Sequence, residues 1–138
     1  MKKSLFLLLV LLLAGACQRG EIFKIEEVRF EKSQGECKGE SSPCAKVELS
    51  YPVLSGGSAA GRERLNGEIR AFALRQIDEA VAKDAAAYAT AFFAEYQKFG
   101  REFPKAPQSW WENRQVKVLL NTPQVFSLSS EWEGYMGG

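Results

Sequence analysis

Two acidic residues near the end of the chain have a type and spacing that could support catalysis. Glu131 and Glu133 lie two residues apart in a segment with strand character. Their side chains would therefore project from one face of a strand, about 7 Å apart. Paired carboxylates at such separations hydrolyse glycosides. The same spacing is common on the solvent face of a strand, and nothing in the sequence marks either residue as buried. A carboxylate hydrolase is thus only a third hypothesis, and we expect a protein that is not an enzyme.

Aromatic residues close to the C-terminal end could bind a ligand. Trp110, Trp111, Trp132 and Tyr135 fall on two segments that we expect to pair as strands. Because Trp110 and Trp111 are adjacent, their side chains must point to opposite faces of a sheet. An exposed tryptophan can stack on a sugar ring or anchor a protein partner, whereas packing in the core or at an edge is the alternative. We take all four as candidate ligand-binding residues.

The composition excludes several kinds of chemistry. The 138 residues include no histidine, which excludes Ser-His-Asp and Cys-His triads, histidine-ligated metal sites and a histidine pH switch. Lys and Arg number 18 against 17 Asp and Glu, so no strong positive field favours nucleic acid. We therefore expect no cofactor, no metal ion and no nucleic-acid partner.

The N-terminal residues indicate where the protein is located. Lys2 and Lys3 give a cationic start, residues 5–13 are all apolar, and small residues then lead to Cys17. The apolar run is too short to cross a hydrocarbon core of about 30 Å, so it is typical of a signal peptide. Its end resembles the lipobox of bacterial lipoproteins, in which cleavage precedes a cysteine that receives diacylglycerol. Ala14 stands where leucine is usual, and an ordinary secreted protein is the alternative.

We accordingly expect a lipoprotein signal peptide over residues 1–16 and a lipidated Cys17 that begins a tether over residues 17–21. Acyl chains would hold the protein on a membrane of the bacterial cell envelope without a transmembrane helix. Gln18 and Arg19 differ from the aspartate typical of inner-membrane retention, so the outer membrane is a candidate location.

The other two cysteines are seven residues apart, with a turn-rich segment between them. Cys37 and Cys44 form an even pair in a chain that we expect to be exported to an oxidising compartment. A metal site is the competing interpretation, but two thiols without a histidine are a poor ligand set. We predict a disulfide.

The rest of the chain predicts an α+β domain over residues 22–138. Residues 47–53 alternate apolar and polar side chains, as in a half-buried strand, whereas the apolar period changes to 3.6 from Leu65 to Val81 and again from Tyr88 to Phe99. Ser58 is a candidate cap for the first helix. Asp84 could cap a separate second helix, or the two could run on with a bend.

Three further segments have strand character. Residues 22–32 are rich in β-formers but lose their alternation near Glu26 and Glu27, which predicts a bulge or break. Residues 110–120 and 125–133 flank a turn. We predict an antiparallel sheet of about four strands with one bent helix or two consecutive helices packed on one face, in the order ββααββ.

Several short motifs occur in one order along the chain: Leu49–Leu54, Leu65-Asn66 with Ile69, Phe93 with Tyr96, Val125–Leu128 and Tyr135–Gly138. This order resembles the N-terminal domain of unknown function shared by PdaC-type peptidoglycan deacetylases and RsiV-type anti-sigma factors. The resemblance covers residues 22–138 and implies an extracytoplasmic α+β domain beside the cell wall. RsiV-like proteins bind lysozyme, and PdaC-like proteins carry their catalysis in a separate deacetylase domain.

In that family the counterpart of Gly137-Gly138 usually leads into Ala-His and a second, C-terminal domain, for which this sequence has no counterpart. Our leading hypothesis is an envelope-anchored, non-catalytic lipoprotein domain that binds a cell-wall glycan (peptidoglycan) or a lysozyme-type muramidase. The alternative is the structural half of a two-domain protein that needs the C-terminal domain to function.

Overall fold

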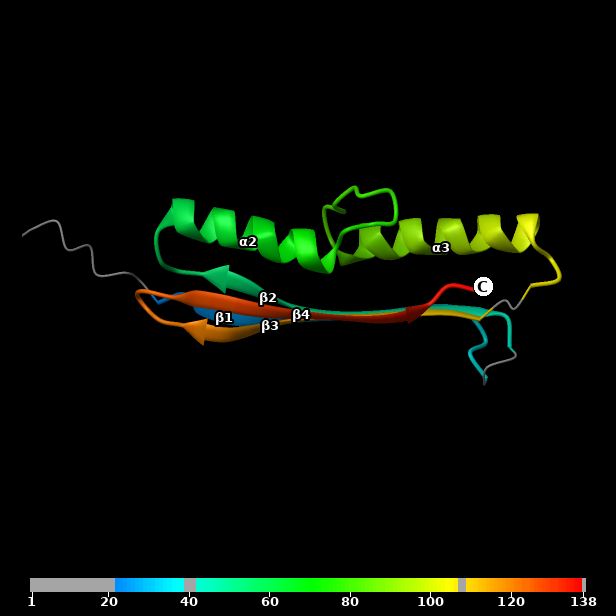
Figure 1. Ribbon diagram of the computed structural model, residues 1–138, viewed down its shortest axis with the longest axis horizontal. Coiled ribbons are helices and arrows are strands. Elements are labelled where there is room, and N and C mark those ends of the chain that lie inside the picture. Colours follow the sequence, from blue (N-terminus) through cyan, green and yellow to red (C-terminus); the bar gives the residue numbers. More distant parts are fainter. Residues whose placement is uncertain (1–21, 39–41, 107–108, 138) are drawn as a thin grey trace, which may run out of the picture.

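The computed structural model describes residues 22–38, 42–106 and 109–137. They form two layers, a four-stranded sheet and two helices that lie over one of its faces (Figure 1). The predicted α+β order ββααββ is confirmed. Among the described residues, no helix is long and apolar enough to cross a membrane. In chain order the elements are β1 (Lys24–Gly35), β2 (Cys44–Ser55), α2 (Ala59–Ala73), α3 (Ala85–Glu102), β3 (Ser109–Asn121) and β4 (Phe126–Tyr135).

The strands lie in the order β1-β2-β3-β4, and the sheet is mostly antiparallel. The central pair differs from the fully antiparallel prediction, because β2 and β3 run parallel with Cys44 opposite Ser109. The connection between them explains this direction. The helices α2 and α3 follow one another along the sheet and return the chain to the end at which β2 began (Figure 1). A crossover of this kind is what parallel neighbours require.

The strand β1 pairs with β2 in one continuous register, from Lys24 opposite Ser55 to Gly35 opposite Cys44. The bulge or break expected near Glu26 and Glu27 was therefore a wrong prediction. Both glutamates are exposed, because β1 is an edge strand. Two polar residues in succession therefore reflect contact with solvent, and the pairing of β1 with β2 continues through them.

The two helical periods belong to separate helices. The helix α2 ends at Ala73, and the chain then makes a short loop in which Ala82 N donates to Leu74 O at 2.9 Å. The prediction that the first helix continues to Val81 was wrong. Ile77 and Val81, which we expected on its core face, are 63% and 46% exposed. Asp84 then caps α3 by accepting a hydrogen bond from the backbone N–H of Ala87.

The core lies between the helices and one face of the sheet. The stripe predicted from Tyr88 to Phe99 on α3 packs there as expected, with its N-terminal part buried and its C-terminal part half-buried. Alternate residues of β2 form the floor of this core, as the period of two predicted. The buried residues include Ala45, Val47, Leu49 and Tyr51 of β2, Ile69 and Ala73 of α2, and Ala89, Phe92 and Phe93 of α3.

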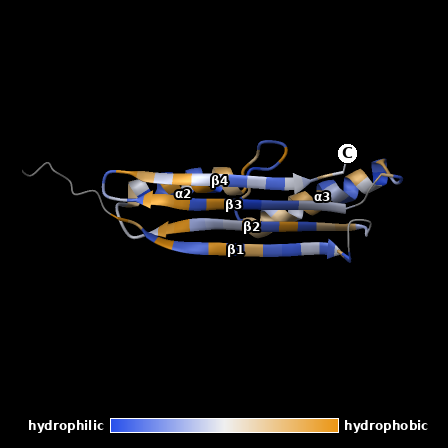
Figure 2. Cartoon of the chain, turned by 60° about the horizontal axis from the view of Figure 1, so that its bottom comes forward, coloured by the Kyte–Doolittle hydropathy of each residue, from blue (hydrophilic) through white to orange (hydrophobic). Residues whose placement is uncertain are grey.

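The opposite face of the sheet carries no helix in the described part of the chain. Figure 2 shows this face with its four strands side by side. Its polar side chains pair with one another across the strands: Lys46 on β2 lies 2.8 Å from a carboxylate oxygen of Glu31 and 2.7 Å from one of Glu48. Pairs of this kind keep an uncovered sheet face compatible with water.

The caps of the two helices give a matched test of this fold. Replacing Asp84 by alanine removes a side-chain acceptor from the first turn of α3, so the free energy of unfolding should fall by about 1 kcal/mol. Ser58 holds the same position before α2, but within the described residues its side chain makes no cap hydrogen bond. The Ser58→Ala variant should therefore change stability by less than about 0.5 kcal/mol. Urea unfolding followed by circular dichroism measures both, and equal losses would contradict this assignment of the caps.

Candidate functional site

The helix side of β4 is only partly covered, and its most exposed aromatic residue is Trp132. The helices pack mainly on β2, with fewer contacts to β1 and β3. Trp132 lies opposite Arg114 of β3 on this side of the sheet, yet it is 57% exposed. Phe72, at the nearby end of α2, is 52% exposed. An aromatic surface therefore remains open beside the helix layer.

A buried carboxylate lies directly beside Trp132. Glu112 of β3 is 1% exposed and accepts three hydrogen bonds from side chains. The Tyr88 hydroxyl donates to it at 2.6 Å, the indole Nε1 of Trp132 donates at 2.7 Å, and the Nε of Arg114 also donates. We call these four residues the Glu112 cluster. A buried carboxylate is tolerated because a cation and neutral donors together replace the water that it has lost.

Arg114 connects the cluster to the loop between the helices. Its Nη1 donates to the backbone carbonyl of Arg75 at 2.6 Å, and its guanidinium carbon lies 5.0 Å from the centre of the Tyr88 ring. Burial, together with the hydrogen bond to Glu112, raises the pKa of Tyr88. Tyr88 therefore stays a neutral donor through the physiological pH range, and the cluster holds one compensated charge pair.

The cluster fixes the orientation of Trp132. Its N–H group points inward to Glu112, while more than half of the residue's surface remains exposed to solvent. A shallow hollow of about 210 Å³ lies beside it. The hollow combines an aromatic ring with polar groups, which is the mixture that a sugar ring requires. Its lining residues are Phe72, Arg114, Val116, Ser130, Glu131 and Trp132.

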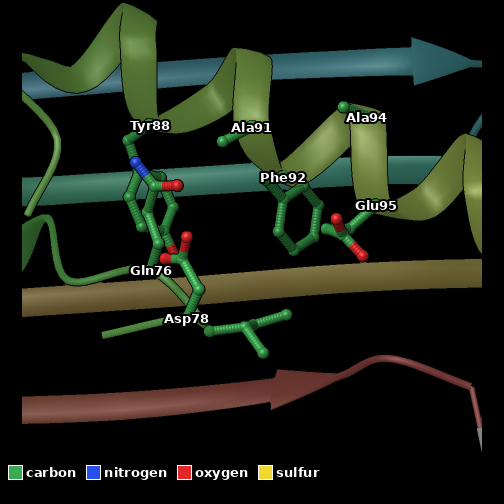
Figure 3. Close-up of a pocket in the computed structure, with 8 residues that line it drawn as sticks. Gln76, Asp78, Tyr88, Ala91, Phe92, Ala94 and Glu95 are labelled. Carbon is green, nitrogen blue, oxygen red and sulfur yellow. The ribbon is translucent and has the colours of Figure 1, made fainter. Parts of the chain in front are cut away.

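A second hollow, of about 310 Å³, is lined in part by Tyr88 of the cluster. Figure 3 shows Tyr88 and Phe92 projecting from α3, and in this view Phe92 lies between the carboxylates of Asp78 and Glu95. Gln76 from the loop before α3 contributes a further polar group. Because Tyr88 both lines this hollow and donates to Glu112, the cluster joins the two hollows.

Trp110 takes no part in this surface. It is 5% exposed, and its ring centroid lies 5.2 to 5.9 Å from those of Phe92, Tyr96 and Phe99 on α3. The sequence predicts Trp110 as a candidate ligand-binding residue, with packing in the core as the alternative. The correction is that its ring is enclosed in the core, because its position on β3 faces α3.

Trp111 and Tyr135 lie opposite each other on the outer face of the sheet and are 42% and 38% exposed. Trp111 thus points away from Trp110, as adjacent strand residues must. The four aromatic candidates therefore do not meet at one site. They divide into Trp110 in the core, a Trp111–Tyr135 pair on the outer face, and Trp132 on the helix side.

The two glutamates considered for catalysis, Glu131 and Glu133, lie on the outer face as well, where they pair with Gln115 and Asn113 of β3. The side chain of Glu131 is 65% exposed and lies 3.8 Å from the amino group of Lys117. This is the arrangement of a solvated strand face. It provides neither the burial nor the enclosed substrate site that a pair of catalytic carboxylates requires.

The cysteines were expected to serve in lipidation and in a disulfide. Cys37 and Cys44 are at disulfide distance, with 2.01 Å between their sulfur atoms, where the β1–β2 loop meets β2. Cys17 lies outside the described residues. Within the residues that are described, no three histidine, cysteine, aspartate or glutamate side chains gather in a group that could hold a metal ion.

Sequence reasoning missed Glu112 and Arg114, although a signal was present. On the helix side of β3, Glu112 and Arg114 lie between Trp110 and Val116, which are both buried. A carboxylate and a guanidinium between two buried apolar residues indicate a buried ion pair, because neither charge could otherwise be accommodated on that face.

The fold is known from another protein of unassigned function. No protein-family model matches the chain, and no curated protein matches it in sequence. The chain is similar to the crystal structure, at 2.30 Å resolution, of a member of the DUF3298 family from Bacteroides fragilis NCTC 9343, with a TM-score of 0.63 and 12% sequence identity. The match covers 88% of this chain and 53% of that chain, so this chain spans about half of its neighbour's length. The likeness shows the fold alone.

Removal of the Glu112 carboxylate should destabilise the protein strongly. The Glu112→Ala variant leaves the Arg114 guanidinium without its buried partner and leaves Tyr88 and Trp132 without their acceptor. The free energy of unfolding should therefore fall by about 3–5 kcal/mol. Glu131→Ala removes an exposed glutamate from the neighbouring strand and should cost less than about 1 kcal/mol. Urea unfolding measures both, and a loss for Glu112→Ala no larger than that for Glu131→Ala would show that the cluster is not a buried charge pair.

Proposed function

We propose that this domain is a non-catalytic binding module of the bacterial cell envelope, and that it binds a wall glycan on Trp132. The observation that carries the proposal is that the Trp132 side chain is both fixed in orientation and exposed to solvent. Its N–H group is held by a buried carboxylate, while the residue is 57% exposed beside a polar hollow. The resemblance to wall-associated domains, given above, supports the same class of ligand.

The physical basis of recognition would be stacking of a sugar on the indole. The C–H groups of a pyranose pack on an aromatic face, while hydroxyl and amide groups at its rim need hydrogen-bond partners. Arg114 and Ser130 line the hollow from the helix side of the sheet and offer both donors and acceptors. Because Glu112 already orders the indole, binding would cost less side-chain entropy than it would at a free tryptophan.

The distribution of the aromatic side chains favours a glycan over a muramidase protein. A stable protein–protein interface buries about 1,200–2,000 Å² around a cluster of anchors. Here the exposed aromatics are divided between the two faces of the sheet, and the hollow at Trp132 measures about 210 Å³. A hollow of that size suits a single sugar unit better than a protein surface.

A second candidate function is that of a structural half that works together with another domain. It is favoured by the length of the DUF3298 neighbour, of which this chain spans 53%. Trp111 and Tyr135 on the uncovered outer face would then be the contact surface for that domain. In this case a Trp111 variant would impair function in the cell, and a Trp132 variant would not.

The two exposed tryptophans provide a matched test of glycan binding. Protein lacking residues 1–16 is titrated calorimetrically with soluble peptidoglycan glycan strands and, in parallel, with lysozyme. Trp132→Ala should weaken glycan binding about tenfold or more, because the stacking surface is lost. Trp111→Ala removes an exposed tryptophan from the other face and should bind as the unsubstituted protein does.

Two results would overturn the glycan proposal. If both variants bound equally, or if folded unsubstituted protein failed to bind glycan strands, Trp132 would not be the platform. Binding to lysozyme without binding to glycan would instead assign the domain to recognition of a muramidase. Circular dichroism of each variant checks that a loss of binding does not arise from unfolding.

The proposed location depends on Cys17, which would carry the lipid. We expect the unsubstituted chain to separate into the detergent phase of a Triton X-114 extract, because several acyl chains each contribute about 0.8 kcal/mol per buried CH₂. The Cys17→Ala variant should lose the modification and leave that phase. Mass spectrometry of the N-terminal peptide identifies the lipid directly. An unmodified Cys17 in membrane-bound protein would rule out lipid anchoring.

A further inference from the structure

Four aliphatic side chains are exposed at the end of the sheet where β1 begins and β2 and β3 end (Figure 1). Their exposed fractions lie between 50% and 61%. The register of β3 against β4 shifts at Leu119, so Leu119 and Leu120 together oppose Ser127. We call the four residues the apolar end: Ile22 before β1, Leu119 and Leu120 on β3, and Val125 before β4.

Hydrogen bonds from Asn121 join the two parts of the apolar end. The side-chain amide of Asn121 donates to the carbonyl of Phe23 at 2.7 Å, and its Oδ1 accepts from the Phe23 N–H at 3.3 Å. The Phe23 ring also packs edge-on against Phe126, with 6.0 Å between the ring centroids. Because Ile22 precedes Phe23 and Leu120 precedes Asn121, the start of the described chain lies beside the β3–β4 hairpin.

The apolar end is also uncharged. Residues 118–130, which include the hairpin turn, contain no acidic or basic residue, and Figure 2 shows hydrophobic residues at this end of β3 and β4. The other end of the sheet is different, because Glu36 and Lys38 form an ion pair at 2.8 Å in the loop between β1 and β2. An exposed apolar patch at one end of a domain marks a surface that binds a partner or a membrane.

We propose that the apolar end docks on the lipid bilayer that anchors the chain, a proposal that rests on the lipidation of Cys17. The short distance to the anchor selects this occupant. Ile22 follows Cys17 by five residues, which span at most about 18 Å when fully extended. The acyl chains would therefore keep the apolar end close to the bilayer. Aliphatic side chains at that level enter the boundary between headgroups and acyl chains by about 5–10 Å.

Docking would set the orientation of the whole domain on the membrane. The exposed Lys24, next to Phe23, would lie at the level of the anionic headgroups. The strand β4 runs away from the apolar end, and Trp132 lies six residues beyond Phe126, or about 20 Å along the strand. The hollow beside Trp132 would thus be held away from the lipid surface. Docking itself requires no glycan.

Probes at the two ends of the sheet test docking in the full-length chain. Val125→Cys places a thiol at the apolar end, and Ser33→Cys places one on an exposed residue near the other end of β1. Each variant is labelled with an environment-sensitive fluorophore and reconstituted into phosphatidylethanolamine–phosphatidylglycerol vesicles that contain nitroxide lipid. The unsubstituted chain, treated in the same way, gives the background. Quenching at position 125 should exceed that at position 33 about fivefold, because only position 125 would lie in the bilayer boundary.

Acidic substitutions test whether the aliphatic side chains make the contact. Leu119→Glu with Leu120→Glu, introduced into the Val125→Cys chain, should lower quenching about fivefold, because a carboxylate resists transfer out of water. The matched control is Ile77→Glu with Val81→Glu, which changes two exposed aliphatic residues in the loop between the helices. Quenching in the control should be unchanged. Circular dichroism checks that each variant is folded.

Each contrary outcome has a distinct meaning. Equal quenching at positions 125 and 33 in a lipidated, vesicle-bound chain would overturn docking and leave the anchor intact. An undiminished signal in the leucine variant, or an equal loss in its control, would show that the apolar end is not the contact surface. A chain without lipid on Cys17 would overturn the anchor and docking together. Protection of position 125 in native membranes but not in pure lipid vesicles would assign the surface to a protein partner and overturn docking on lipid.

Discussion

The burial of one carboxylate determines how the parts of this domain fit together. Glu112 lies on the helix side of β3 without access to water, so it needs donors, and each donor comes from a different place in the chain. Tyr88 provides one from α3, Trp132 provides one from β4, and Arg114 provides the compensating charge from β3 itself. Arg114 also holds the loop between the helices through the carbonyl of Arg75. Displacement of α3, β4 or that loop would leave a buried polar group unpaired, at a cost of about 1–3 kcal/mol or more.

The crossover connection explains why this cluster lies at the border of the helix layer. Because α2 and α3 join two parallel central strands, they pack mainly over β2 and leave the helix side of β4 partly open. On β3, residues facing the helices are fully covered at Trp110 and Glu112, whereas Trp132 on β4 lies at the border. The same topology that buries the carboxylate therefore exposes the ring that it holds.

Much of this arrangement could be predicted from apolar periodicity, which reports which face of an element is covered. It identified the strands, the α3 stripe and the opposite orientations of Trp110 and Trp111. It failed where apolar residues are exposed, since Ile77 and Val81 continue the helical period although the chain has left the helix. The parallel central pair was also missed, because the direction of β3 depends on where α3 delivers the chain and not on any local pattern.

The Glu112 cluster was missed because apolar periodicity does not indicate a charged residue that is buried. The chemistry of this cluster bears on function. Replacing a buried ion pair by apolar side chains often leaves stability unchanged or raises it, so stability alone does not account for a carboxylate here. An apolar side chain at position 112 could fill the same volume, but it could not accept a hydrogen bond from the indole. Trp132 would then be free to rotate toward Phe72 and the hollow beside it. The carboxylate thus contributes a fixed orientation of one exposed ring, and such an orientation is useful to a surface that stacks on a ligand.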